Sequence, residues 1–482
     1  MDPQRPTQEE LAAAHDAPEA VRGRGFAAFF VTAGWFHIVN QIPWPKEPFT
    51  PSLARLGAEG VMLVAGLWVL ARPRNAFWPF LVYVGATWFH GLREVPRVAN
   101  HWWLTFLITS ALLAYGVAEA RRGGSLARFV ERAGPAVRWL LLVGYGFAAL
   151  AKFNHAFLDP DVSCASRAWV DIGTKWYTWL PTGPFWQGAA IVATLVVEAA
   201  LPVLLLTRWR GQAVVVGAVF HFLISFTPIL RVPDFCSLLF ATWWLFLPDE
   251  TMRALARARR LVPAWSVGRT LVGAAGGVGL LAVSQAALGR WDGGQLFQSL
   301  RLTSFSAYGM VWIGAVALAV VAAPVAARPV PMRLSGWRGG WAVALIAVTV
   351  ASGLAPYLGL RTRASLAMFS NLRTEDHRPN HLFMPQVYLM DAQLDLVTIV
   401  ETDLAKVRKE TANGERLTWW EVRYRAQEAG HGRLVYRRGD GPEVVVQDVA
   451  EAPDLMAPFS WWETRVHIFR PVDADGVSRC QW

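Results

Sequence analysis

Blocks of about twenty apolar residues, separated by short charged segments, recur along the first three quarters of the chain. A helix of that length rises about 30 Å, which is the thickness of a bilayer's hydrocarbon core. Buried helices of a soluble protein can mimic one such block, but not a long series of them. The pattern predicts about eleven spans, near residues 26–43, 54–71, 76–92, 99–118, 137–156, 184–206, 212–230, 234–248, 270–289, 305–326 and 339–358.

From residue 360 onward the pattern changes to an alternation of apolar and polar residues, which is typical of β-strands. TWWEVRYRA, RLVYRRGDGPEVVVQDV and ETRVHIFRPV alternate in this way, and Gly439-Asp440-Gly441 supplies a turn. We therefore expect an all-α polytopic membrane bundle with a small, mostly β extracytoplasmic domain. The expected parts are an N-terminal tail at 1–25, the transmembrane bundle at 26–359 and the C-terminal domain at 360–482.

Lysine and arginine are divided unevenly between the two sides of the expected bundle. The N-terminal tail and the alternate loops on its side hold twenty arginines, whereas the opposite loops hold nine lysines and arginines. Because cytoplasmic loops carry the excess of positive charge, the N-terminus is predicted to be cytoplasmic. An odd number of spans then places the C-terminal domain outside, in a multi-pass protein of the inner (plasma) membrane. The first 25 residues lack the apolar core of a signal peptide.

Composition agrees with a membrane protein, since 54% of the residues are hydrophobic and 17% are charged. Soluble domains carry nearer 25% charged residues. The net charge of +10 does not indicate nucleic-acid binding, because the basic residues lie at the ends of apolar blocks. The expected partner is the lipid bilayer. Cys164, Cys236 and Cys480 form no CxxC pair and no zinc spacing, so no metal site and at most one disulfide, of undetermined pairing, are expected.

A lone lysine in an apolar segment is the strongest candidate for chemistry. The chain has only five lysines, and Lys152 stands in GYGFAALAKFNHAFL, near the outer end of the fifth expected span. A lysine at the centre of a span costs about 3 kcal/mol, so such residues are functional candidates. A desolvated lysine can act as a base at neutral pH, which arginine cannot. The simpler alternative is a side chain that snorkels to the interface.

Several other polar residues map to the same outer half of the expected bundle as Lys152. A shared depth predicts a polar cavity open to the outside, although a lone histidine in a span is more often a structural hydrogen-bonding group. Glu198 lies within the sixth expected span and His221 in the middle of the seventh. The residues of the outer half are His37, Glu59, His90, His101 and His155.

A polar segment, MFSNLRTEDHRPNHLFMP at residues 368–385, follows the last expected span. Its composition alone is typical of a solvated linker. Its apolar flanks, Met368-Phe369 and Leu382-Phe383, instead favour a lid pinned against the bundle.

Three of these segments resemble the vitamin K-dependent γ-carboxylases. YGFAALAKFNHAFLDPD is similar to the segment around their catalytic lysine, and Asn100-His101, followed by two aromatic residues and a leucine, resembles their Asn-His helix start. VFHFLISF with the later DFCSLLFATWWLFLP is similar to their histidine-bearing helix and the span after it. Together these segments resemble the horizontally transferred transmembrane domain, over about residues 26–250.

The resemblance implies a membrane enzyme in which Lys152 deprotonates a reduced naphthoquinone (menaquinol or vitamin K hydroquinone), assisted by His101. Reaction with O2 then gives a strong base that removes a γ-proton from a glutamate, and the carbanion captures CO2. The cofactor must carry this step, because the proton is too weakly acidic for a side chain. The substrate is a peptide or a small molecule of the glutamate type. The residues expected at the cofactor are His37, Asn100 and His221, and those expected at the substrate are Asn371, Arg373, Glu375, Asn380 and His381.

Other classes stay open, because a shared lysine does not guarantee a shared reaction. One is a non-carboxylating quinone- or lipid-linked enzyme, and another is a membrane binding or transport protein. Prolines within expected spans fit the broken helices of transporters, but no repeat is visible. A cytochrome b-like haem protein is disfavoured by single histidines in the spans. The arginine-, alanine- and tryptophan-rich composition is typical of a GC-rich bacterial genome.

Overall fold

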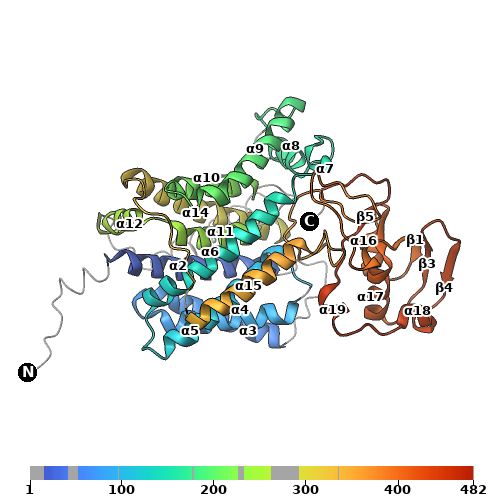
Figure 1. Ribbon diagram of the computed structural model, residues 1–482, viewed down its shortest axis with the longest axis horizontal. Coiled ribbons are helices and arrows are strands. Elements are labelled where there is room, and N and C mark those ends of the chain that lie inside the picture. The colour runs from blue at the N-terminus through green and yellow to red at the C-terminus, as the bar shows by residue number, and fades with distance from the viewer. Residues whose placement is uncertain are drawn as a thin grey trace, which may run out of the picture. The chain divides into compact units, whose positions relative to one another are not determined.

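The computed structural model describes residues 16–41, 53–95, 97–175, 178–225, 233–261, 293–334 and 336–480. Helices make up most of the described chain to about residue 354, and the strands carry the orange-red colour of the C-terminal residues (Figure 1). The helices up to that point are α2 (Pro18–Gln41), α3 (Leu53–Ala71), α4 (Phe77–Glu94), α5 (Asn100–Ala120), α6 (Leu126–Leu150), α7 (His155–Leu158), α8 (Cys164–Lys175), α9 (Pro184–Leu204), α10 (Arg210–Ile224), α11 (Pro233–Trp243), α12 (Asp249–Leu261), α14 (Gly293–Ala322) and α15 (Gly336–Leu354).

Helices occupy ten of the eleven expected spans, and the ninth, 270–289, lies outside the described residues. In the described part of the chain, five helices are long and apolar enough to cross a membrane: α3, α5, α6, α9 and the Ser304–Ala322 part of α14. α10 and the Gly339–Leu354 part of α15 are apolar but shorter. The expectation of membrane-type helices is confirmed, whereas the number eleven stays a prediction.

These long helices expose large apolar side chains. On α9, Val192 and Val196 are 59% and 60% exposed, and on α14 Val311 and Val321 are 72% and 85% exposed. Val192 and Val196 are four residues apart, so they lie on one face of the helix. Water disfavours such faces, whereas hydrocarbon accepts them. The exposed faces therefore fit a lipid environment.

α11 is a core helix. Every residue from Pro233 to Leu247, which includes α11 and the 3₁₀ turn η2 (Trp244–Phe246), is buried. Its eleven residues rise only about 16 Å, well short of a bilayer core. A helix that is enclosed and apolar on all sides packs inside a protein. The expected short span at 234–248 is therefore a buried helix, packed closely on α2.

The chain forms two compact units. Unit 1 comprises Met1–Arg93, Thr105–Leu142 and Ala200–Leu345, and unit 2 comprises Glu94–Leu104, Val143–Ala199 and Ile346–Trp482. The C-terminal residues thus group with two earlier segments of the chain, one of which contains Asn100 and the other Lys152.

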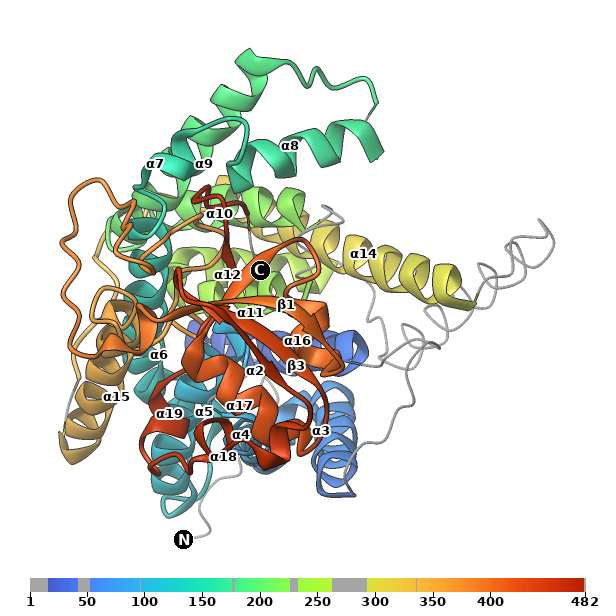
Figure 2. The ribbon, with the colours of Figure 1, turned by 90° about the vertical axis from the view of Figure 1, so that its right-hand side faces the viewer.

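Unit 2 contains an antiparallel sheet in the order β4-β3-β1-β2-β5, of which Figure 2 shows β1 and β3. β3 and β4 form the hairpin predicted from RLVYRRGDGPEVVVQDV, with Leu434 opposite Val446 and the turn at Gly439-Asp440-Gly441. Gly439 has φ +51°, a conformation that suits glycine. The hairpin prediction is confirmed. The strands are β1 (Leu396–Thr402), β2 (Glu415–Thr418), β3 (Leu434–Arg438), β4 (Glu443–Val446) and β5 (Val472–Asp473).

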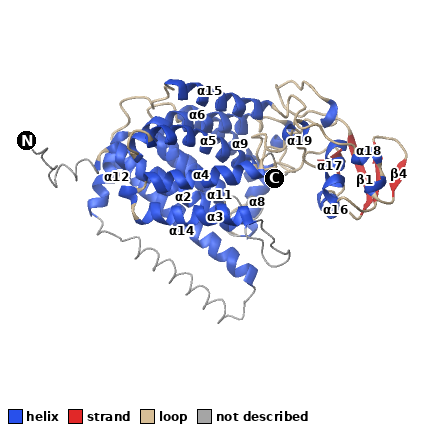
Figure 3. Cartoon of the chain, turned by 90° about the horizontal axis from the view of Figure 1, so that it is seen from below, coloured by secondary structure: helices blue, strands red, loops and turns tan. Residues whose placement is uncertain are grey.

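The prediction of a mostly β domain is wrong, because TWWEVRYRA forms a helix, α17 (Trp419–Ala429). The Thr418 hydroxyl accepts a hydrogen bond from the Glu421 amide at 3.2 Å, and Gly430, with φ +76°, ends the helix. Thr-Trp-Trp-Glu is the spacing of a capping box, and this signal competes with the alternation. Val422 and Ala426 of α17 are buried in the domain core, where Val397 of β1 also lies. Figure 3 shows α17 beside the strands.

ETRVHIFRPV likewise begins with a short helix, α19 (Glu463–Val466), rather than a strand. Two more short helices, α16 (Ala405–Glu410) and α18 (Pro453–Met456), complete the α+β fold. The 3₁₀ turns of the chain are η1 (Pro73–Asn75), η2, η3 (Asp391–Gln393) and η4 (Val449–Glu451).

A disulfide joins Cys164 at the start of α8 to Cys480, with 4.9 Å between the Cα atoms. It lies in a small apolar cluster with Phe157 and Ile191. Cys236 is a buried free thiol. The structure thus gives the pairing that the sequence left open.

Removal of this disulfide should destabilise unit 2, and replacement of the second cysteine as well should have no additional effect. Cys164→Ser and Cys480→Ser should lower the melting temperature in detergent equally, and the double variant should fall no further, because either change removes the same cross-link. The expected loss is about 2–4 kcal/mol. Cys236→Ser, which keeps the disulfide, is the control. Wild-type protein that reacts with a thiol reagent at all three cysteines after unfolding without reductant would contradict the assignment.

Candidate functional site

Lys152 lies in the turn that follows α6, two residues after Leu150, and is 4% exposed. The sequence predicted a helix to residue 156, which is wrong. The helix stops because Asn154 starts a new one: its side chain accepts a hydrogen bond from the Phe157 amide at 2.8 Å and caps α7. Lys152 and His155 therefore do not share a helix face; Lys152 is buried and His155 is exposed.

Three oxygen atoms surround the Lys152 side chain. Its Nζ lies 2.7 Å from Oε2 of Glu198 and donates hydrogen bonds to the carbonyls of Ala148 at 3.1 Å and Met368 at 3.0 Å. The two carbonyls use two of the three ammonium donors, and the carboxylate oxygen lies within ion-pair distance. Because Glu198 is also buried, at 6% exposed, water screens this attraction little. The two side chains therefore form a close contact away from water.

Glu198 is the functional candidate to which the sequence analysis gave no role. It is the one carboxylate of α9, and Lys152 follows directly on the apolar end of α6. Each charge alone would be costly to bury, so each needs the other. In the sequence, Lys152 and Glu198 are isolated, opposite charges in apolar segments, which was the available signal for an ion pair. The sequence does not show that the two side chains are in contact.

The loop that supplies the Met368 carbonyl is strained. Non-glycine residues with positive φ are uncommon, and each costs of order 1 kcal/mol or more. Six of them lie within 14 residues here, which indicates that the surrounding structure holds the loop in place. They are Ala364, Leu366, Phe369, Asn371, Asp376 and His377.

Two of the sequence motifs hold this loop. The Asn100 side chain accepts a hydrogen bond from the Leu366 amide at 2.9 Å, and Lys152 donates to the Met368 carbonyl. Asn154 donates to the Ser370 carbonyl at 2.5 Å. The Asn-His and Lys-Phe-Asn motifs therefore contact alternate residues of the same short loop.

Asn371 and Asn380 use their amide groups within unit 2. Asn371 accepts from the Cys164 amide at 2.8 Å and donates to the carbonyls of Val162 and Ser478, both at 2.9 Å. Asn380 donates to the Asn371 carbonyl at 2.8 Å. Both side chains position the loop. The flanking Leu382 and Phe383 are exposed, so the lid and the substrate contact stay predictions.

Arg373 and Glu375 also form internal contacts. Glu375 is fully buried, and the Nε of Arg470 lies 3.1 Å from its carboxylate. Burial opposes ionisation of Glu375, but the charge of Arg470 and hydrogen bonds from the backbone outweigh it and lower the pKa of that carboxyl. Arg373 donates to the Asp473 carbonyl at 3.4 Å and lies 3.5 Å from Asp376.

His381 is held by its two ring nitrogens. Nδ1 accepts from the amides of Phe383 at 3.3 Å and Met384 at 3.0 Å, and Nε2 lies 2.9 Å from the Leu150 carbonyl. These contacts assign the proton to Nε2. Burial lowers the pKa of His381, which keeps the ring neutral.

Unit 1 holds a second buried polar group. Nδ1 of His37 lies 3.4 Å from the Asp234 carboxylate, and the His37 and His90 rings are 5.8 Å apart. Asp234, at the start of α11, was not singled out from the sequence. His221 in α10 is buried and packs on Phe235 with 5.6 Å between ring centroids.

The predicted site residues thus fall into two groups. Unit 2 contains Lys152, Asn100, His101 and the five residues of the polar segment, whereas unit 1 contains His37 and His221. His101 is the second residue of α5 and is partly buried. The catalytic, cofactor and substrate roles of these residues stay predictions.

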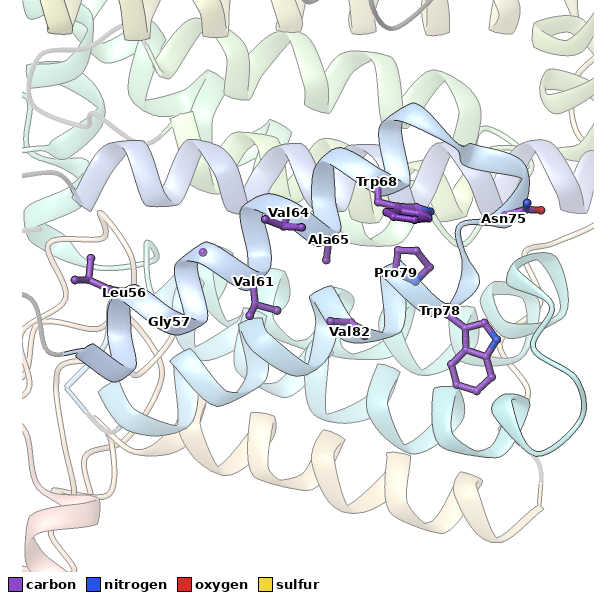
Figure 4. Close-up of a pocket in the computed structure, with 11 residues that line it drawn as sticks. Leu56, Gly57, Val61, Val64, Ala65, Trp68, Asn75, Trp78, Pro79 and Val82 are labelled. Carbon is purple, nitrogen blue, oxygen red and sulfur yellow. The ribbon is translucent and has the colours of Figure 1, made fainter.

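An open apolar groove of about 820 Å³ lies between α3 and α4 in unit 1 (Figure 4). Val61, Val64, Trp68 and Val82 are among its lining residues, and Asn75 is its one side-chain amide. No predicted site residue lines it. Its character suits lipid chains rather than polar chemistry.

Comparisons of the chain with known protein families, with curated proteins and with solved structures found no match.

The Lys152–Glu198 contact should behave as a coupled pair. Lys152→Met or Glu198→Leu alone should each cost about 3–5 kcal/mol, because each leaves an uncompensated buried charge. The double variant should melt at a higher temperature than either single variant in the same detergent. Losses that simply add would show that the two side chains do not interact.

The Glu375–Arg470 pair should contribute to acid sensitivity. Because folding lowers the pKa of Glu375 below 4.5, the stabilisation is present above that pH and is lost as the pH falls below it. Glu375→Gln should therefore lower stability at pH 7 and flatten its decline below about pH 4.5. Glu443→Gln, in an exposed pair with Arg437, is the control and should change stability by less than about 1 kcal/mol. An unchanged acid transition in Glu375→Gln would contradict the prediction.

Proposed function

We propose that this protein is a quinol-dependent, carboxylase-like membrane enzyme in which Lys152 and Glu198 handle the proton of a reduced naphthoquinone. The observation that carries the proposal is the buried Lys152–Glu198 contact at 2.7 Å. A protein with a buried ion pair is often less stable than one with apolar residues at the same positions. Stability alone therefore does not explain why the chain has this pair. Its position beside a strained loop favours a catalytic role.

The pair offers a route for the proton. Transfer of one ammonium proton from Lys152 to Glu198 leaves a neutral amine and a neutral carboxylic acid, with no change in the total charge. The neutral amine can then accept a proton from an acidic hydroxyl bound beside it. Glu198 is therefore the proton acceptor that makes Lys152 available as a base.

The residues beside Lys152 fit an aromatic quinol. Ala151, Tyr357 and Leu372 form a buried apolar cluster. The Tyr357 hydroxyl is buried and has no hydrogen-bond partner in the described part of the chain. A quinol oxygen would satisfy it. Tyr357 and Lys152 would hold the quinol, which supplies the proton and, with O2, the strong base that side chains lack.

The proposed topology has a cytoplasmic N-terminus and places residues 360–482 on the extracytoplasmic side of a bacterial plasma membrane. The Cys164–Cys480 disulfide supports this orientation, because disulfides persist in oxidising compartments. The proposed substrate is a glutamate-type peptide or small molecule, with CO2 as the second substrate.

The proposal predicts lysine-dependent quinone epoxidation. Purified protein in detergent would receive reduced menaquinone or vitamin K, O2, labelled bicarbonate and a glutamate-containing peptide. Lys152→Ala should lower epoxide formation by at least about 100-fold, because a positioned base contributes about 10²–10⁴-fold. Lys406→Ala, which changes an exposed lysine paired with Glu428, is the control.

The products separate the alternatives. Label in the peptide together with epoxide supports carboxylation. Lysine-dependent epoxide without label would replace it with a non-carboxylating quinone-linked enzyme. Neither product, under conditions in which a known carboxylase works, would overturn the quinol chemistry and favour binding or transport.

A further inference from the structure

Arg361 is a buried cation with an unusual set of contacts. It follows α15 in unit 2 and is 8% exposed. Its Nη2 donates to the Ser352 hydroxyl at 2.7 Å, and its guanidinium carbon lies 5.2 Å from the centre of the Trp103 ring. Within the described residues, its other four N–H donors have no protein acceptor.

The hydrogen-bond partner of Arg361, the Ser352 hydroxyl, is neutral and cannot accept or donate a further hydrogen bond. The Ser352 hydroxyl also accepts from the Trp103 indole at 2.9 Å and donates to the Val348 carbonyl at 2.7 Å. Burial alone lowers the pKa of Arg361 to about 10, since no carboxylate in the described chain acts against it. The positive charge is therefore not balanced by the surrounding described protein.

The other buried arginines of unit 2 differ. Arg425 lies 2.7 Å from Glu410, and Arg373 lies 3.5 Å from Asp376. A buried charge without an opposite partner is costly, so the charge of Arg361 requires a different explanation from theirs.

A second source of positive potential lies beside Arg361. Trp103 is the fourth residue of α5, a helix of 21 residues. Arg361 therefore contacts α5 through a side chain of its first turn. The N-terminus of a helix attracts anions. Both features favour the same kind of ligand.

We propose that Arg361 binds the carboxylate of the substrate. The identity of that substrate, a glutamate-type acid, rests on the proposed function. The planar guanidinium matches a carboxylate in a two-point contact, and the Trp103 ring packs beside it. This site was not among the predicted substrate residues.

The position of Arg361 in the chain connects this site to Lys152. The strained loop runs from Ala364 to His377 and begins three residues after Arg361. Met368 in that loop supplies a carbonyl to Lys152. One short segment of backbone therefore carries both the carboxylate-binding group and a partner of the base.

The test measures binding without quinone or O2. Two blocked peptides, identical except for one glutamate or glutamine, would be titrated by calorimetry into the full-length protein in detergent. The glutamate peptide should bind at least about tenfold more tightly. Arg361→Gln should remove this preference, with a loss of about 10- to 100-fold for the glutamate peptide. Arg361→Lys should lie between, because it keeps the charge but not the planar fork.

Stability distinguishes this role from a structural one. Arg361→Gln should melt at the same or a higher temperature than wild type, because it removes an unbalanced buried charge. Arg363→Gln is the matched control; Arg363 is more exposed, is paired with Glu410 at 3.3 Å, and should keep the glutamate preference.

Three results would overturn the proposal. The first is that wild type binds the two peptides with equal affinity. The second is that Arg361→Gln keeps the preference for the glutamate peptide. The third is that inorganic phosphate binds more tightly than the glutamate peptide and that its binding depends on Arg361. The last result would assign the site to a phosphate, and vesicles with and without anionic phospholipid would show whether a lipid supplies it. Epoxidation is measured separately, so loss of the Arg361 assignment and loss of the quinol chemistry are distinguishable.

Discussion

The contact between the Lys152 ammonium and the Glu198 carboxylate is the constraint on which the candidate site of unit 2 depends. Neither charge would be tolerated alone at such low exposure. Because the ammonium also binds the Met368 carbonyl, the pair fixes the loop as well as itself. Unfavourable backbone conformations at Leu366 and Phe369 persist since this contact and the bond from Asn100 hold both ends of the segment.

The same contact connects the ion pair to the loop. Lys152 lies 2.7 Å from Glu198 and donates to the Met368 carbonyl at 3.0 Å. The conformation of the loop and the position of the lysine side chain are therefore coupled through a single hydrogen bond.

The sequence predicted features that depend on local composition. Apolar blocks gave the helices, Gly439-Asp440-Gly441 gave the hairpin, and the rarity of lysine singled out Lys152. It failed where another local signal competed, as in the Thr418 cap that turns an alternating segment into α17. It also could not pair Lys152 with Glu198, because only the packing of two helices brings residues 46 positions apart together.

In unit 2, the buried arginines differ in whether a carboxylate lies beside them. Arg425 and Arg373 each have a carboxylate partner, so the folded chain itself accounts for them. Arg361 is also buried, at 8% exposed, but has only a neutral hydroxyl and an aromatic ring as neighbours. Such a group adds little to the stability of the folded protein. It can add to the affinity for an anion, because it offers a charged, pre-oriented hydrogen-bond donor. Among the described residues of unit 2, Arg361 is therefore the buried arginine that most strongly indicates a ligand.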